Sequence, residues 1–130
     1  MKNSNRIKGC FMICIPILFS LLLLIIGVVW RTSYAKTEIV TSFSDDGRKK
    51  LSVYMIGEPD WPFGSTHCRF DLYIDEERIA KYPFSVRNDG MSCSENNFSI
   101  LWGEDSVKIG VSGEEQSEKE YVLDFQGKIK

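Results

Sequence analysis

An uncharged, strongly apolar run extends from Gly9 to Trp30 and limits the folds that this chain can adopt. A transmembrane helix needs about 20 mostly apolar residues to cross roughly 30 Å of hydrocarbon, and this run has that length. Backbone N–H and C=O groups find no water in lipid, so a single spanning segment must be helical. The sequence therefore predicts one transmembrane helix over residues 9–30, with the lipid bilayer as its partner.

The charges on either side of this run predict its orientation. Residues 1–8 form a short basic tail with three cations and no acid. Positive flanks of a membrane span stay in the cytoplasm. Arg31 and Lys36 lie on the other flank, but the tail and the α-amino group outnumber them. We expect a single-pass cell-membrane protein with its N-terminus in the cytoplasm and the rest of the chain outside.

The end of the apolar run leaves two readings open. Trp30 and Tyr34, with Arg31 between them, suit the headgroup layer on the outer side. A cleaved signal peptide has a shorter apolar core, of about 7–15 residues, and a small-x-small cleavage site. Ser33-Tyr-Ala35 is a weak site of this kind, and Arg31 interrupts the approach to it. An uncleaved signal anchor is favoured, and a cleaved, secreted form is the alternative.

The remainder of the chain divides into a linker, residues 31–36, and an extracytoplasmic module, residues 37–130. A module of this length can bury a modest core. All 18 acids of the chain and 11 of its 16 cations lie after residue 36, so the module has a net charge of −7. We do not expect such a module to bind nucleic acid, or an anionic lipid surface, by general attraction.

Alternation of apolar and polar residues predicts about seven short strands in the module. Asp45-Asp-Gly47 and Asn88-Asp-Gly90 are strong turn signals, and Pro83 assigns its strand to an edge or a bulge. The expected strands are residues 38–43, 51–56, 67–74, 79–86, 98–102, 107–111 and 121–125. This pattern predicts an all-β fold, a small antiparallel sandwich or open barrel, preceded by one transmembrane helix.

The residue types that usually act in catalysis or bind metals do not form a catalytic or metal-binding group in this sequence. His67 is the only histidine, and adjacent residues of a strand point to opposite faces, so it cannot act on Cys68. One histidine without a Cys-x-x-Cys pair provides no zinc site. The acidic clusters fall in turns and lack the spacing of a calcium loop. We expect no catalytic residue, no metal and no cofactor, and hence no enzyme.

Cys68 and Cys93 are the two cysteines of the outer module. An even pair in an oxidising compartment is a disulfide candidate. Cys68 also belongs to the apolar face of its strand, where buried free thiols are common. The bridge is favoured, and the free pair is the alternative.

The loop from Gly57 to Gly64 is the candidate contact with a partner. It places Trp61 and Phe63 between prolines, with Glu58 and Asp60 beside them. Tryptophan is enriched in binding hot spots, and loops on rigid β scaffolds often carry function. The competing interpretation is that both rings fold back and cap an open end of the core, because large aromatic side chains are usually buried.

The outer module resembles a domain family of unknown function that occurs in short membrane-anchored proteins of Gram-positive bacteria. The resemblance rests on Ser44-Asp-Asp-Gly47 followed by Leu51-Ser-Val-Tyr54, and on Ile100-Leu-Trp-Gly-Glu-Asp105 followed by Val107-Lys-Ile109. It implies a single-span anchor and a β-rich outer domain. It implies no activity and no catalytic residues.

Two functions fit these observations. The first is a membrane-anchored binding or regulatory module that recognises another protein or a component of the cell envelope. The second is an immunity protein that neutralises a basic toxin, which an acidic module would suit electrostatically. Acidity is not specific, and the first function is therefore preferred.

Overall fold

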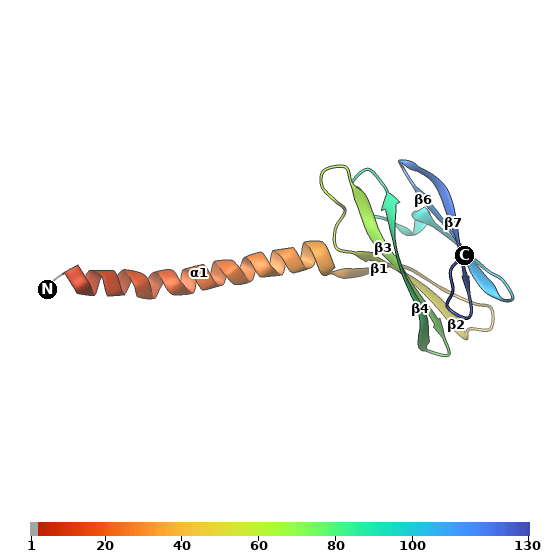
Figure 1. Ribbon diagram of the computed structural model, residues 1–130, viewed down its shortest axis with the longest axis horizontal. Helices are drawn as coiled ribbons and strands as arrows, with labels where there is room; N and C mark the ends of the chain where they lie inside the picture. Colours follow the sequence, from red (N-terminus) through yellow and green to blue (C-terminus); the bar gives the residue numbers. More distant parts are fainter. Residues whose placement is uncertain (1–2) are drawn as a thin grey trace.

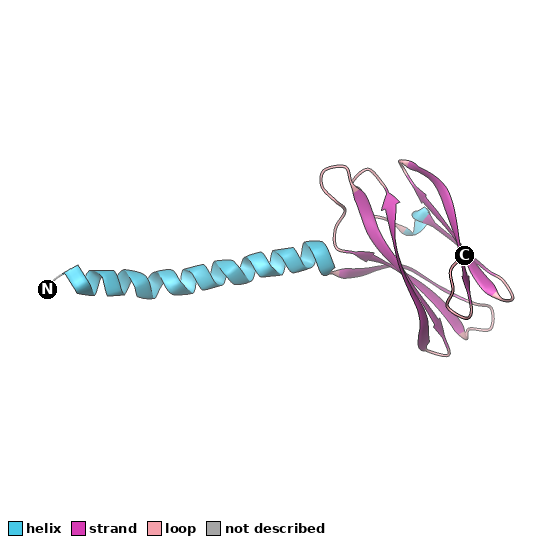
Figure 2. Cartoon of the chain, in the orientation of Figure 1, coloured by secondary structure: helices cyan, strands magenta, loops and turns pink. Residues whose placement is uncertain are grey.

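The structure is a computed structural model that describes residues 3–130, while the side chains of residues 3–11 and 13 lie outside the description. One long helix leads into a β domain (Figures 1 and 2). The elements are α1 (Asn3–Tyr34), β1 (Lys36–Phe43), β2 (Lys49–Ile56), β3 (Ser65–Ile74), β4 (Glu77–Arg87), a 3-10 turn η1 (Glu95–Asn97), β5 (Phe98–Trp102), β6 (Ser106–Gly113) and β7 (Gln116–Asp124).

Helix α1 contains a segment, Cys14–Tyr34, that is long and apolar enough to span a membrane. None of that segment is buried against the rest of the chain. A helix whose apolar side chains all face outward needs another apolar phase around it. The structure thus confirms an N-terminal apolar helix that could cross a bilayer, as the sequence predicts.

The helix is longer than the predicted span at both ends. It begins at Asn3, so most of the predicted tail, residues 1–8, is helical, and residues 1–2 are outside the described part. At the other end it continues to Tyr34, and β1 begins at Lys36. Only Ala35 separates helix from strand, where the sequence predicts a linker over residues 31–36. The Thr32 hydroxyl supports this last turn by donating to the carbonyl oxygen of Val28 at 3.0 Å.

The β domain consists of two antiparallel sheets, with strand orders β1-β2-β3-β4 and β5-β6-β7. Each sheet is a simple meander, and the chain crosses from one to the other between β4 and β5. The all-β expectation is confirmed, and the two separate sheets make the domain a sandwich rather than a barrel. Figure 1 shows the four-stranded sheet on the helix side of the domain and the three-stranded sheet beyond it.

The core lies between the sheets, and strand alternation selects its residues. Leu51 and Val53 of β2 are fully buried, as the period-2 pattern predicts, and they belong to one core with Val107 and Ile109 of β6. The Phe70 and Phe84 rings stack with centroids 4.0 Å apart. Burying one such side chain contributes roughly 1.5–3 kcal/mol. Further core residues are Cys68, Leu72, Val86, Val111 and Leu123.

Two features of the strands can be compared with the predictions from the sequence. Pro83 lies on β4, an edge strand of its sheet, as expected for a residue with no N–H to donate. The charged stretch at residues 112–118 falls between the expected strands 107–111 and 121–125, where no strand is predicted, but it is mostly strand in the structure. β6 and β7 extend until Gly113 pairs with Gln116, which leaves Glu114 and Glu115 as a tight turn.

Candidate functional site

The segment Gly57–Gly64, here called the aromatic loop, connects β2 to β3 beside the end of α1. The Gly57 N–H donates to the carbonyl oxygen of Ala35 at 2.7 Å, and the Glu58 N–H donates to that of Thr32 at 2.8 Å. The last carbonyl groups of a helix lack partners within the helix, so this loop satisfies two acceptors at the junction. The loop is therefore fixed to the end of the apolar helix.

The aromatic side chains of this loop are exposed. Trp61 is 92% exposed and Phe63 is 71% exposed, so neither ring caps the core, and that interpretation fails. Glu58 and Asp60 are exposed on the same loop. A tryptophan this exposed is unusual for a residue with so large an apolar surface, and together with Phe63 it makes this loop a candidate contact surface.

Close backbone packing holds the loop in place. Gly90 has φ +72°, and a Cβ there would lie 2.5 Å from the Pro62 carbonyl oxygen. The Gly90 N–H donates to the carbonyl oxygen of Gly64 at 2.9 Å. Asp60 contacts the His67 ring, with 3.1 Å between Oδ2 and Nε2. The loop thus presents its aromatic rings from a fixed backbone.

His67 and Cys68 lie on opposite faces of β3, as the alternation predicts. His67 is exposed, with Nδ1 3.2 Å from the Ser85 hydroxyl, whereas Cys68 is buried. Among the described residues, no group of three or more histidine, cysteine or acidic side chains could hold a metal ion.

A cleft of about 480 Å³ opens where the helix meets the domain. Arg31 from α1 and Trp61 and Glu58 from the aromatic loop line it, together with Met55 and Ser92. The predicted interface residues Trp30, Arg31 and Tyr34 are all exposed on the last turns of the helix. The helix end and the aromatic loop are separate segments of the sequence. In the structure they form one surface.

The outer face of the four-stranded sheet, here called the basic face, carries most of the exposed cations of that sheet. Strand pairing places six cations and two acids on it, which gives a net charge of +4: Lys36, Lys50, Arg69, Arg78, Lys81 and Arg87 with Glu38 and Asp71. From Lys36 onward the remaining residues hold six cations and sixteen acids. The net charge of the module conceals this separation, which was not predicted from the sequence. Alternate residues of a strand share one face of the sheet, so assigning the cations to faces by their positions in each predicted strand would have identified the basic face.

Asp71 is the centre of the basic face. Its side chain is fully buried and accepts two hydrogen bonds from Arg69, at 2.8 and 2.9 Å. Lys36 Nζ and Arg78 Nη1 also approach it, at 3.6 and 3.5 Å. Lys36 Nζ lies 3.5 Å from the centroid of the Tyr54 ring as well. The single Asp71 carboxylate therefore interacts with three cationic side chains, which leaves a net positive charge on the outer surface of the sheet.

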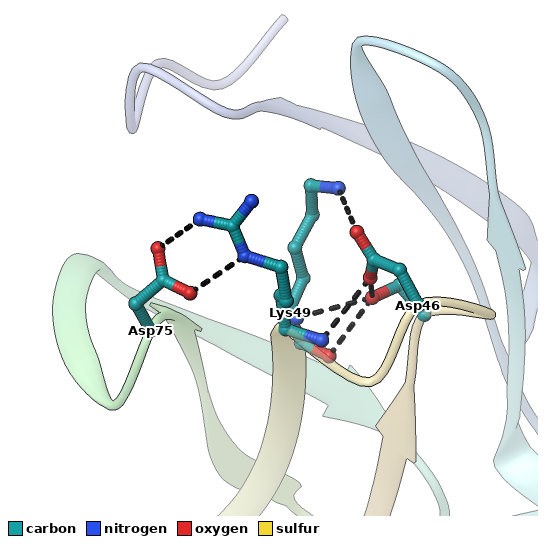
Figure 3. Close-up of polar contacts among 5 residues, drawn as sticks. Asp46, Lys49 and Asp75 are labelled. Atoms are coloured by element: carbon teal, nitrogen blue, oxygen red, sulfur yellow. Dashed lines mark hydrogen bonds and ion pairs between the residues drawn. The ribbon is translucent and has the colours of Figure 1, made fainter.

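A second polar cluster lies at the far end of the domain, in the β1–β2 turn (Figure 3). Asp46 accepts hydrogen bonds from the Ser44 hydroxyl and the Arg48 backbone N–H, and these lower the pKa of Asp46 to about 2. The Arg48 guanidinium donates two hydrogen bonds to Asp75, at 2.8 and 2.6 Å, and lowers the pKa of that carboxyl group. These contacts pair Asp46 and Asp75 with hydrogen-bond donors of the same cluster.

Cys68 and Cys93 are free thiols in the structure, and no disulfide is found between them. Interaction between the two side chains raises the pKa of Cys68 and lowers the pKa of Cys93. Burial raises the pKa of Cys68 further. The two side chains lie near enough to interact, and the bridge itself stays a prediction.

The fold and its surfaces define a class: a small two-sheet β domain fixed to the end of an apolar helix. Comparison with protein-family models, curated proteins and solved structures finds no match.

Proposed function

We propose that this protein is a single-pass membrane protein whose extracytoplasmic β domain is a binding or regulatory module without catalytic activity. Its N-terminus is in the cytoplasm, and the domain contacts its partner through the aromatic loop. The observation that supports this most is the exposure of Trp61 and Phe63, 92% and 71%, on a loop fixed by backbone hydrogen bonds. A pre-organised loop loses little conformational entropy on binding.

Membrane orientation is tested with a C-terminal reporter that fluoresces only in the cytoplasm. We expect the fusion protein to show no fluorescence. Protease added to protoplasts should remove the domain while the N-terminal tail stays protected. A fluorescent fusion would refute the orientation.

The contact role is tested by placing a photo-crosslinking amino acid at position 61 in cells. Leu101 is a matched control position, because it is also a large apolar side chain, 67% exposed, but lies on the far sheet. A light-dependent adduct at position 61 and none at position 101 supports the proposal. No adduct at either position contradicts it.

Measurements of the free energy of unfolding distinguish a contact role of Trp61 from a role in folding. Trp61→Ala should change the free energy of unfolding by less than about 0.5 kcal/mol, because the ring is exposed. Trp102→Ala is the matched control. Its indole Nε1–H donates to the Ser42 hydroxyl at 2.9 Å, and its ring stacks on Phe125, so truncation should cost about 3–5 kcal/mol.

The proposal includes a Cys68–Cys93 disulfide in an oxidising compartment, formed with loss of two protons and two electrons to an external oxidant. It is supported by the contact between the two thiols. Protein taken from its native compartment should then show neither thiol under denaturing, non-reducing alkylation. Labelling of both would rule the bridge out.

The resemblance to membrane-anchored proteins of Gram-positive bacteria is consistent with this proposal. The immunity function is the second candidate. One observation favours it: outside the basic face, the residues from Lys36 onward have six cations and sixteen acids, an acidic surface suited to a basic partner. Growth protection against a toxin encoded beside this protein would distinguish it.

A further inference from the structure

We propose that the partner of the aromatic loop is the lipid surface itself: the β domain docks on the anionic headgroup layer with Trp61, Phe63 and the basic face. This inference rests on the proposed function, since it requires the helix to span the membrane. Three independent observations carry it: the height of the loop, the exposed rings and the separation of charge.

The hydrogen bonds at the junction set the height of the loop. Glu58 is bonded to Thr32, which lies two residues beyond Trp30, or about 3 Å along a helix that rises 1.5 Å per residue. With Trp30 at the hydrocarbon boundary, the headgroup layer extends about 5–8 Å further. The aromatic loop therefore lies within this layer, where tryptophan side chains are enriched in membrane proteins.

The arrangement of the sheets turns the basic face toward the same side. The core lies between the sheets, and the four-stranded sheet is on the helix side of the domain (Figure 1). Its outer face, with a net charge of +4, is consequently on the membrane side. The loop acids Glu58 and Asp60 reduce this to +2, and Arg31 at the helix end raises it to +3. Asp89 is also exposed, and it precedes the Gly90 that packs against the loop, so it brings the sum on this side to +2.

This charge distribution fits an anionic bilayer. Each Lys or Arg near such a surface contributes about 1 kcal/mol, a roughly fivefold change in the docking equilibrium constant. The attraction acts only within about a Debye length, ~8 Å at physiological ionic strength, so only a domain already held at the surface benefits. The helix provides that tether, and the domain then needs only to tilt onto the headgroups.

The test uses the full chain in liposomes that contain brominated lipids, which quench nearby tryptophan fluorescence. Difference spectra between the wild type and Trp30→Phe, Trp61→Phe and Trp102→Phe assign the quenching to each tryptophan. We expect quenching of Trp30 and Trp61 and none of Trp102, whose ring packs on Phe125 in the sandwich. Quenching of Trp61 should increase with phosphatidylglycerol content and decrease in high salt.

Charge reversals test the basic face. Lys81 and Arg87 are exposed positions of β4, and neither forms an ion pair with Asp71, although Lys81 is its cross-strand neighbour. Lys81→Glu with Arg87→Glu should reduce Trp61 quenching in anionic liposomes at least fivefold, while an unchanged circular dichroism spectrum shows that the domain remains folded. Lys119→Glu with Lys128→Glu is the matched control, because both are exposed and belong to β7 or follow it. The control pair should leave the quenching unchanged.

The outcomes separate this inference from the proposed function. Quenching of Trp30 without quenching of Trp61 overturns lipid docking and leaves the anchor intact. Quenching of Trp61 that is indifferent to both phosphatidylglycerol and the β4 reversals also overturns it. A crosslink from position 61 to a protein instead of a lipid overturns it but supports the binding module. If Trp30 is not quenched, the spanning helix and the docking both fail.

Discussion

The Gly57 N–H lies 2.7 Å from the carbonyl oxygen of Ala35, and this contact joins the aromatic loop to the end of the apolar helix. Gly57 has φ +71°, and a Cβ there would collide with the Thr32 carbonyl oxygen, which belongs to the main chain. Only glycine fits such a site without moving the backbone. The position of the exposed rings relative to the helix therefore depends on this one residue.

We predict that Gly57→Ala opens the junction. The matched control is Gly47→Ala, because Gly47 has nearly the same φ, +70°, but nothing within 4 Å of its added Cβ. Both variants should incur the cost of a left-handed alanine, about 1–2 kcal/mol. Only Gly57→Ala should also remove the amide-exchange protection of Glu58. Equal exchange in the two variants would contradict the steric argument.

We predict that Asp71→Asn strongly destabilises the domain. Removing one partner of a buried ion pair costs about 3–5 kcal/mol, and here three cations, Lys36, Arg69 and Arg78, would lose their shared carboxylate. Asp75→Asn breaks the exposed pair with Arg48 and is the control, since exposed pairs contribute little. Urea unfolding followed by circular dichroism measures both. Comparable losses of unfolding free energy in the two variants would show that the burial of Asp71 does not determine the effect.

The two thiols should differ in reactivity in the reduced, folded protein. Contact with Cys68 lowers the pKa of Cys93, which is also the more exposed of the two, whereas burial and that contact raise the pKa of Cys68. Because the thiolate is the reactive form, iodoacetamide should modify Cys93 well before Cys68. Peptide mass spectrometry measures the order. Denatured protein, where the two should react alike, is the control.

Acid should weaken the β1–β2 turn through Asp46. Its pKa is lowered from 3.8 to about 2 in the folded state, so its contribution to stability is present above pH 4 and is lost as the pH falls through 2. Asp46→Asn should therefore reduce the decrease in urea midpoint between pH 4 and pH 2. Asp45→Asn, on the same turn, is the control. An unaltered pH profile in Asp46→Asn would refute the assignment.

Much of the architecture could be predicted from local patterns. The length of the apolar run indicates a helix, and period-2 alternation places Leu51, Val53, Phe70 and Leu72 in the core, where the structure has them. These predictions succeed because helix and strand periodicities are local properties of the chain. The boundaries at residues 31–36 and 112–118 differ from the structure, because hydrogen bonds to distant segments extend the helix and the β6–β7 strands.

Local residue patterns account for the apolar helix, the order of the seven strands and the opposite orientation of His67 and Cys68, because each follows from the residues nearby. Three further features arise only from the folded arrangement of the chain. These are the exposure of Trp61 and Phe63, the contact between Cys68 and Cys93, and the gathering of six cations on one face of a net acidic module. Each depends on which strands pair and which face meets the second sheet, and those are long-range choices that local composition does not encode.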